Sequence, residues 1–120
     1  MEPIYDRNGR TVAWFDGEEG DVFDAAGRPI GFVDGDGYYS YRFGQYLGEF
    51  DGGIFWDRYG RAVTFLDGAT GGPLLPVLSI PPIPPIPGIP PIRPMTPVPP
   101  VAPLQSLSWS DAVFTELFSS

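Results

Sequence analysis

The amino-acid sequence predicts an all-β fold: four tandem β-hairpin repeats in a pseudo-four-fold funnel, followed by a proline-rich polyproline II tail and a short C-terminal helix. One observation behind this prediction is a segment of about 14 residues that occurs four times in the first half of the chain. The other is an aliphatic side chain at every third position of the proline-rich stretch. Together they divide the chain into a hairpin domain (1–72), an arm (73–107) and a helix (108–120).

The repeat becomes visible when the copies are aligned on a shared glycine. The copies cover residues 4–17, 22–35, 39–52 and 55–68, and they align without an internal gap. Every copy also ends in an Asp-Gly pair. The shared glycines are Gly9, Gly27, Gly44 and Gly60. Repetition of this kind is typical of proteins built from one supersecondary unit.

Each copy is predicted to form a β-hairpin. A short β-branched and aromatic run is followed by Asp-x-x-Gly-Arg, which suits a type I turn with a left-handed glycine. The aspartates Asp6, Asp24 and Asp57 are expected to cap these turns. The arginines that follow the glycines are expected to pair with the aspartates, and they are Arg10, Arg28 and Arg61. The third copy has Tyr41 and Gln45 at the two positions, and this joint change favours a structural role for the pair.

The second strand of each copy alternates with a period of two, as a half-buried strand does. One position in the middle of this strand holds a small residue in every copy. The four small residues are Ala13, Gly31, Gly48 and Thr64. They predict crowding where the hairpins converge. Because an isolated hairpin is marginal in water, the copies must bury their faces against one another.

Four such hairpins, a proline-rich stretch and a Trp-Ser-containing C-terminus resemble the bacterial four-fold β-flower family (4-fold beta flower). The resemblance covers residues 4–68 and, more loosely, the tail. It implies a funnel-shaped or flower-shaped all-β domain with no established activity. Because the third copy departs from the pattern, the symmetry is expected to be imperfect there. The tyrosine–aspartate repeats of Rhs-type proteins are similar in sequence, but they are longer and run in large arrays.

The composition excludes several classes of function. The chain has no cysteine, histidine or lysine, so it lacks the commonest metal ligands, general base and Schiff-base nucleophile. Its formal charge of −8 opposes binding to nucleic acid and to anionic membranes. The N-terminus lacks the pattern of a signal peptide, and a cytoplasmic location is therefore predicted, with export by another route left open. No cofactor is predicted.

Carboxylates are frequent, but their spacing does not indicate a metal site or catalysis. The acidic stretches 16–21 and 34–37 lack the twelve-residue calcium loop and its closing glutamate. Asp-Gly pairs are expected to serve the connections between hairpins instead. Pairs of acids that could hydrolyse glycosides are unavoidable at this density of carboxylates. We therefore predict no catalytic residues, no metal ligands and a protein that is not an enzyme.

The hairpin domain is rich in aromatic residues, and these support two interpretations. A domain this small needs large side chains to build its core. Alternatively, aromatic side chains line the mouth of the funnel and bind a small ligand. The candidates for this ligand site are Trp14, Phe32, Tyr39, Tyr41, Tyr46 and Phe65. Aromatic hairpin repeats also occur in modules that bind carbohydrate or choline in bacterial cell walls, which is a further alternative.

The arm has the period of a polyproline II helix, which has three residues per turn. Its aliphatic residues therefore form one stripe, which we expect to lie against another surface. A straight arm would be too long for its own domain. It is expected to double back near Gly88 or to contact another molecule, either a like arm or an unknown protein, rather than an SH3-type reader. The partner-binding candidates in the arm are Ile80, Ile83, Ile86, Ile89 and Ile92.

The last segment is predicted to be an amphipathic helix over residues 108–120. Ser108 and Asp111 resemble a capping box, and apolar residues share one side of the helix. These apolar residues are Trp109, Val113, Phe114, Leu117 and Phe118. Such a short helix needs a docking surface, either its own β-domain or a partner. The sequence thus favours a non-enzymatic protein-interaction or scaffold protein, which could form a homo-oligomer. The alternative is a small-ligand-binding domain.

Overall fold

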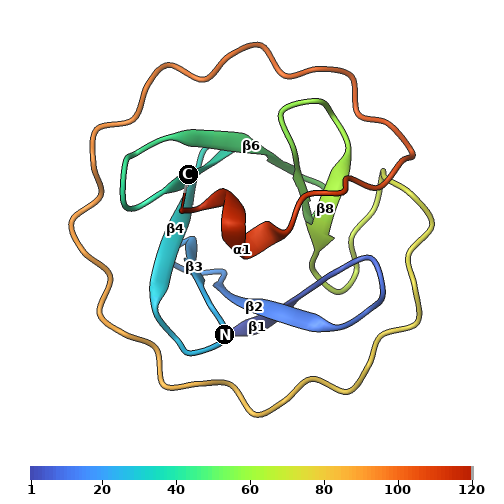
Figure 1. Ribbon diagram of the computed structural model, residues 1–120, viewed down its shortest axis with the longest axis horizontal. Helices are drawn as coiled ribbons and strands as arrows, with labels where there is room; N and C mark the ends of the chain where they lie inside the picture. Colours follow the sequence, from blue (N-terminus) through green and yellow to red (C-terminus); the bar gives the residue numbers. More distant parts are fainter. Residues whose placement is uncertain (120) are drawn as a thin grey trace.

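The computed structural model describes residues 1–119, which form eight strands and one short helix (Figure 1). The strands are β1 (Glu2–Tyr5), β2 (Thr11–Asp16), β3 (Asp21–Phe23), β4 (Pro29–Asp34), β5 (Gly37–Ser40), β6 (Tyr46–Asp51), β7 (Ile54–Trp56) and β8 (Ala62–Phe65). The helix is α1 (Phe114–Leu117). Each strand pairs with the next, and β8 pairs with β1 through Phe65 and Tyr5, so that the antiparallel sheet closes.

The predicted hairpins are present as four consecutive strand pairs. We call them hairpin 1 (β1–β2), hairpin 2 (β3–β4), hairpin 3 (β5–β6) and hairpin 4 (β7–β8). The register of each pair shifts once, because the second strand contains one extra residue opposite the end of the first strand. The extra residues are Val12, Ile30, Leu47 and Val63. This shared bulge identifies equivalent residues in the four hairpins.

The turns confirm the predicted aspartate caps. The Asp24 carboxylate accepts hydrogen bonds from the backbone N–H groups of Ala26 and Arg28, both at 2.9 Å. Asp6 and Asp57 make the equivalent bonds in hairpins 1 and 4. The ion pairs Arg28–Asp24 (2.9 Å) and Arg61–Asp57 (3.4 Å) form as predicted. Within residues 1–119, the predicted pair between Arg10 and Asp6 does not form.

Hairpin 3 differs from the predicted alignment, because its turn is one residue longer. The Gly44 N–H donates to the Ser40 carbonyl, four residues back, whereas the Gly27 N–H donates to Asp24, three residues back. Ser40 therefore stands where the other hairpins have aspartate, and its hydroxyl faces the N–H groups of Phe43 and Gln45. The assignment of Tyr41 to the capping position was wrong for this reason.

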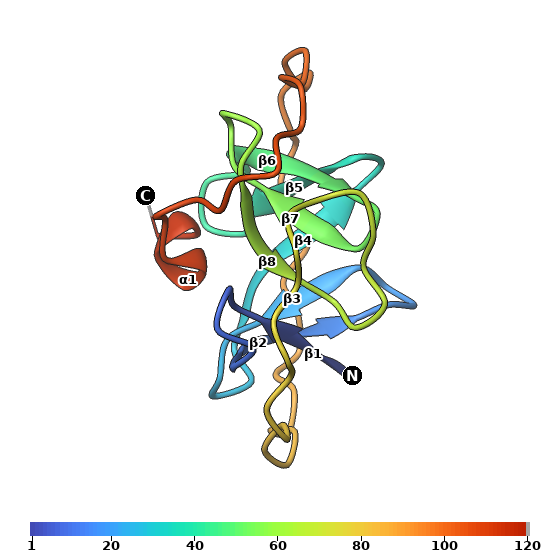
Figure 2. The ribbon, with the colours of Figure 1, turned by 90° about the vertical axis from the view of Figure 1, so that its right-hand side faces the viewer.

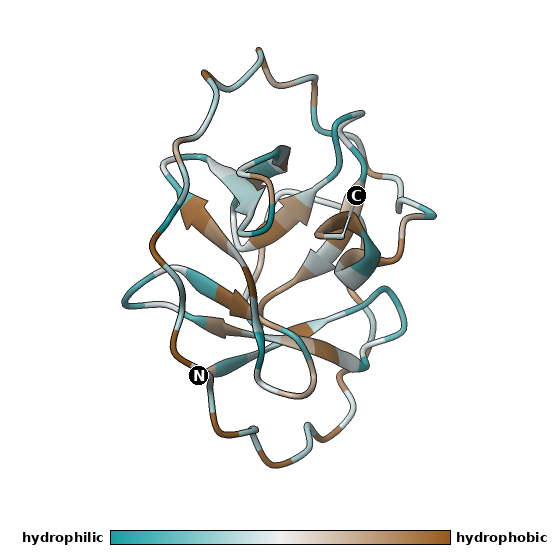
Figure 3. Cartoon of the chain, turned by 60° about the vertical axis from the view of Figure 1, so that its left-hand side comes forward, coloured by the Kyte–Doolittle hydropathy of each residue, from teal (hydrophilic) through white to brown (hydrophobic). Residues whose placement is uncertain are grey.

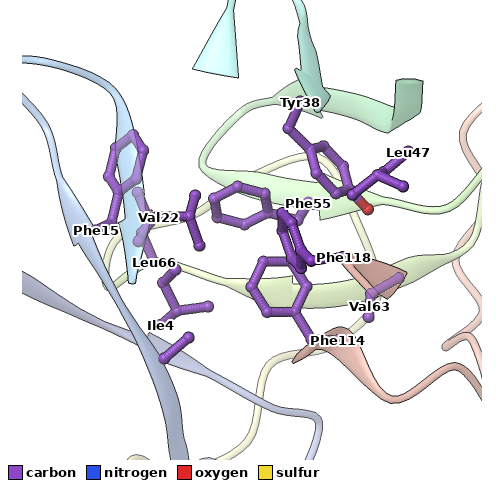
Figure 4. Close-up of a cluster of buried hydrophobic side chains, with 11 residues drawn as sticks. Ile4, Phe15, Val22, Tyr38, Leu47, Phe55, Val63, Leu66, Phe114 and Phe118 are labelled. Atoms are coloured by element: carbon purple, nitrogen blue, oxygen red, sulfur yellow. The ribbon is translucent and has the colours of Figure 1, made fainter. Parts of the chain in front are cut away.

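The interior of the barrel is packed with apolar side chains from all four hairpins and from the C-terminal segment (Figure 4). Phe55 lies at its centre, with ring centroids of Tyr38 and Phe114 at 5.2 and 5.0 Å. The predicted crowding at the small residues is present. A Cβ atom at Gly31 would overlap the ring of Phe118, and one at Gly48 would overlap the carbonyl of Trp56.

The C-terminal helix is shorter than predicted and begins later. Ser108 and Ser110 continue in an extended conformation and pair with Ala62, with hydrogen bonds of 3.1 and 2.7 Å. The predicted capping box at Ser108 is therefore wrong, and the N-cap of α1 is Val113 without a side-chain bond. Position 120 of the predicted helix lies outside the described residues. The α1 segment covers one end of the barrel (Figure 2).

The arm encircles the barrel in a single turn, in the plane of its two long dimensions (Figures 1 and 2). The expectation that the arm doubles back near Gly88 or leaves the domain is wrong for a geometric reason: a chain too long for a diameter fits a perimeter. At about 3.1 Å per residue, the rise of an extended proline-rich chain, the 27 steps from Val77 to Leu104 span about 84 Å. Three quarters of the perimeter of a circle 36 Å wide is about 85 Å.

The arm meets the hairpins at the four shared glycines. A Cβ atom at any of these glycines would lie less than 3.0 Å from a carbonyl oxygen of the arm. The arm residues concerned are Val77, Ile86, Met95 and Leu104, which are nine residues apart. All four glycines also have positive φ, between 61° and 85°, so both backbone conformation and space require glycine.

Replacing Gly60 by alanine tests this contact, with Gly68→Ala as the matched control. Gly60 and Gly68 have φ of 81° and 84°, but a Cβ at Gly68 would meet nothing within 4 Å. Both substitutions lower stability to some extent, because alanine is disfavoured at positive φ. We expect Gly60→Ala to lower the free energy of unfolding in urea by about 1–3 kcal/mol more than Gly68→Ala, because only the former displaces the arm. Equal losses would contradict a close contact between arm and turn.

Candidate interaction surface

Twelve aliphatic side chains of the arm point away from the barrel and form a continuous line around it. We call this set the girdle. Its members are Leu74, Val77, Ile80, Ile83, Ile86, Ile89, Ile92, Met95, Val98, Val101, Leu104 and Leu107. Each is between 78% and 98% exposed. In Figure 3 the girdle appears as hydrophobic segments at regular intervals along the arm.

The outward direction of the girdle is the opposite of what the sequence led us to expect. A hydrophobic stripe was expected to lie against a surface, but between Ser79 and Ser106 the arm meets the barrel through prolines, backbone groups and a few polar side chains. Partly buried arm residues include Pro85, Pro90, Pro94 and Ser106. Because the contacts with the barrel use the residues between the aliphatic ones, the aliphatic side chain at every third position points outward.

Backbone hydrogen bonds hold the arm at three of the four turns. Two residues beyond each carbonyl contact, the arm offers an N–H to the carbonyl of the turn glycine. These bonds are Ser79 to Gly9 (2.9 Å), Gly88 to Gly27 (2.8 Å) and Ser106 to Gly60 (2.8 Å). The equivalent residue at hairpin 3 is Pro97, which has no N–H to donate. Serine and glycine thus interrupt the prolines where a donor is needed.

Two polar side chains of the arm reach down to the barrel. The Arg93 guanidinium lies 3.3 Å from the Asp21 carboxylate, donates to the Glu19 carbonyl and stacks 4.9 Å above the centroid of Phe32. The Gln105 amide donates to Glu49 (2.8 Å) and to the Asp51 carboxylate (2.9 Å). These contacts join the arm to the acidic connections between hairpins.

The beginning and end of the arm meet at hairpin 4. Leu75 and Leu78 pack against an apolar cluster that contains Trp56 and Phe65. Trp109 packs on the same cluster, with its ring 5.9 Å from that of Phe65. The circle is thus closed on one cluster, which holds both ends of the arm.

The six aromatic residues predicted to line a funnel mouth do not form one site. Four of them lie together on hairpins 2 and 3, and these are Phe32, Tyr39, Tyr41 and Tyr46. Phe65 belongs to the cluster at hairpin 4, and Trp14 is buried outside these clusters. The Tyr41 hydroxyl donates to the Asp21 carboxylate. Burial, and then this hydrogen bond, raise the pKa of Tyr41.

The C-terminal candidates also divide into two groups. Phe114 and Phe118 are buried in the barrel core, which differs from the expectation of a partner-binding face. Leu117 is partly buried against the same core, whereas Val113 is exposed. The core thus retains most of the apolar side chains of the last segment, and the girdle presents those of the arm.

Two further classes of feature are missing from residues 1–119. That part of the chain has no group of three or more His, Cys, Asp or Glu residues arranged to hold a metal ion. It also has no helix of the length and apolar character needed to cross a bilayer.

A closed sheet of four hairpins, encircled by its own C-terminal arm, defines a class of small all-β repeat proteins. The chain belongs to the 4-fold beta flower family, whose model matches residues 2–118. This match includes the arm and the helix as well as the hairpins. Comparison with curated proteins and with solved structures gives no match to this chain.

Replacing Ser79 by proline tests whether the backbone bonds hold the arm, with Ser79→Ala as the control. Proline removes the N–H that donates to Gly9, whereas alanine keeps it. We expect Ser79→Pro to lower the free energy needed to detach the arm locally from hairpin 1 by about 0.5–1.5 kcal/mol. Hydrogen exchange at the Gly88 amide, which donates to the Gly27 carbonyl at the next turn, measures this, as faster exchange in the proline variant. Identical exchange in both variants would show that this bond does not hold the arm.

Proposed function

We propose that this chain is a non-enzymatic protein-interaction or scaffold module and that the girdle is its contact surface. The observation that carries this proposal is the exposure of twelve aliphatic side chains in one unbroken line. Exposed apolar residues are normal when scattered, but contiguous patches on a soluble protein are typical of interaction sites.

The girdle offers enough apolar surface for a partner to bind. Full burial of one Val, Leu or Ile side chain contributes about 1.5–3 kcal/mol. An arc of four neighbouring girdle residues, such as those from Ile80 to Ile89, would contribute about 6–12 kcal/mol. This is comparable to the cost of association, about 4–15 kcal/mol, so an arc with some additional polar contacts is sufficient.

The shape and charge of the module favour a different protein over a second copy. The girdle is convex, so two girdles side by side would touch over a short arc and bury less than the ~800 Å² per partner of a stable interface. The net charge of −8 also opposes self-association. A partner with a flat or concave apolar surface avoids both problems.

The finer architecture supports the same proposal. We infer that the arm has polyproline II geometry, because its exposure repeats every three residues. We also infer a pseudo-four-fold flower arrangement, because equivalent glycines contact the arm at intervals of nine residues. Polyproline II is stiff and has no internal hydrogen bonds, so an arm of this kind presents its side chains without a large ordering cost.

The alternative function is small-ligand binding by an aromatic-lined funnel. The barrel interior is occupied by packed side chains, among them Phe15, Phe55 and Phe114, and this argues against a ligand inside it. A separate cluster of aromatic residues outside the barrel core favours a ligand site elsewhere. Its buried members are Phe32, Tyr39 and Tyr46. That place is considered in the next subsection.

Substituting part of the girdle with serine tests the proposed contact surface. The variant carries Ile83→Ser, Ile86→Ser and Ile89→Ser, all at positions more than 90% exposed. We expect its stability to change by less than about 0.5 kcal/mol per site. Immobilised wild-type chain should retain a partner from a lysate of the source organism, and the serine variant should lose most of it.

The matched control carries Phe43→Ser and Tyr59→Ser, which remove exposed aromatic surface outside the girdle. It should retain the partner as the wild type does. Analytical ultracentrifugation of all three proteins measures self-association separately. Retention by the girdle variant equal to that of the wild type would disprove the contact surface. Self-association that only the girdle variant loses would identify a second copy as the partner.

A further inference from the structure

A cavity of about 390 Å³ lies between the arm and hairpin 3. We call it the open corner. Its barrel side is formed by Asp34, Asp36, Gly37, Tyr39, Tyr46 and Glu49. Its arm side is formed by four residues between 96 and 100 and by Ala102. Carboxylates and aromatic rings thus face a wall of prolines.

The repeat register relates the open corner to the place where Arg93 reaches the barrel, which we call the filled corner. In hairpin 2, Asp21 pairs with Phe32; in hairpin 3, Gly37 pairs with Glu49. The N–H groups of Val33 and Phe50, the next residues, donate to the carbonyls of Gly20 and Asp36. On the arm, Ala102 is nine residues after Arg93. The two corners are therefore equivalent, one hairpin apart.

The filled corner shows which chemical group this geometry accepts. The Arg93 guanidinium carbon lies over the Phe32 ring, 4.9 Å from its centroid, and the guanidinium pairs with the Asp21 carboxylate at 3.3 Å. A planar cation over an aromatic face, with a carboxylate at its edge, is a favourable arrangement. The protein thus satisfies this corner with its own guanidinium.

The open corner lacks the internal cation, and its carboxylates and aromatic rings come from other positions of the repeat, because Gly37 and Glu49 are the residues equivalent to Asp21 and Phe32. Ala102 replaces Arg93, and Gly37 replaces Asp21, which creates the space. Asp34, Asp36 and Glu49 supply negative charge, and within residues 1–119 none of the three forms an ion pair. The Gln105 amide bonds to Glu49, but it is neutral.

Two tyrosines, Tyr39 and Tyr46, line the open corner. Both residues are mostly buried, at 3% and 9% exposed, but their hydroxyl oxygens are not among the buried oxygens of residues 1–119 that lack a partner. The hydroxyls are therefore accessible from the cavity that the two residues line. Their rings meet at 5.6 Å in a T-shaped pair. Burial raises the pKa of both, and the charges of Asp34 (for Tyr39) and Glu49 (for Tyr46) raise it further. Both hydroxyls therefore stay protonated and can bond to a ligand.

We propose that the open corner binds the guanidinium or ammonium group of an organic cation. The aromatic rings of Tyr39 and Tyr46 and the carboxylates around them take the roles that Phe32 and Asp21 have for Arg93. The cavity is larger than one guanidinium, so it also accommodates the methylene chain that carries the group. This chemistry is shared by small alkyl guanidines and by arginine side chains of another protein.

A titration of the full chain with agmatine, which carries a guanidinium and an ammonium, tests the proposal. Amide spectra should shift saturably at Gly37, Tyr39 and Tyr46. A neutral urea of the same chain length should cause no such shift. The absence of saturable shifts up to about 10 mM agmatine would overturn the proposal.

Variants at Ala102 give the sharpest control. Ala102→Arg places a guanidinium at the position equivalent to Arg93, so it should fill the open corner and weaken agmatine binding at least about tenfold. Ala102→Gln adds similar bulk without charge and should bind agmatine better than the arginine variant. Equal affinity in both variants would overturn the proposal, because the site would then not depend on this corner.

Substitutions on the barrel side test the binding groups themselves. Glu49→Gln and the pair Tyr39→Phe, Tyr46→Phe should each weaken agmatine binding about three- to tenfold. Glu18→Gln removes an exposed carboxylate outside the cavity and should leave the affinity unchanged. If Glu18→Gln weakened binding as much as Glu49→Gln, the attraction would be general electrostatics, and the site would be disproved.

A blocked peptide with one central arginine, titrated in parallel, separates the two sources of the cation. Tighter binding of the peptide would indicate an arginine side chain of a protein, and tighter binding of agmatine would indicate a small molecule. The girdle variant of the previous subsection should bind agmatine as the wild type does. The two proposals can therefore fail independently.

Discussion

The nine-residue register between the arm and the hairpin turns is the constraint on which the rest of the structure depends. At each hairpin a glycine without Cβ allows an arm carbonyl to approach the turn. At three hairpins the same glycine accepts a hydrogen bond from the arm two residues later. A side chain at the turn would push the arm outward. The path of the arm, the direction of the girdle and the open corner therefore all follow from Gly9, Gly27, Gly44 and Gly60.

This register works because nine is a multiple of three. The exposed aliphatic residues of the arm recur every three residues, so after nine residues the arm presents the same side to the next hairpin. Arm carbonyls meet the barrel at all four steps and backbone donors at three of them, and aliphatic side chains point outward at every step. A one-residue slip would turn girdle residues such as Ile86 toward the turn and remove the donor that Gly27 requires. The three-residue period of the arm and the nine-residue spacing of its contacts with the turns therefore fix the register together.

The sequence predicted the parts of the fold that depend on near neighbours. The hairpins and aspartate caps rest on contacts within a few residues, such as Asp24 with Arg28. The direction of the girdle was missed because hydrophobicity predicts burial, while backbone groups and proline rings that attach the arm give no such signal. A second signal was available: the nine-residue units that begin at Val77, Ile86 and Met95 are alike. The open corner could not be predicted, because Gly37, Glu49 and Ala102 become neighbours only through the sheet register.

The departures from the repeat are concentrated at hairpin 3 and the arm beside it. There the turn is longer, Ser40 replaces aspartate, Pro97 removes the donor, and Ala102 removes the cation. Of these changes, Pro97 gives up a backbone hydrogen bond that the other three hairpins keep, whereas Ser40 still accepts hydrogen bonds from its turn and the Arg93 contact occurs at hairpin 2 alone within residues 1–119. The closed sheet tolerates the loss because β5 and β6 are still paired on both sides, with β4 and β7. A repeat protein can therefore open one corner to a ligand while the equivalent contacts elsewhere maintain the arm around it.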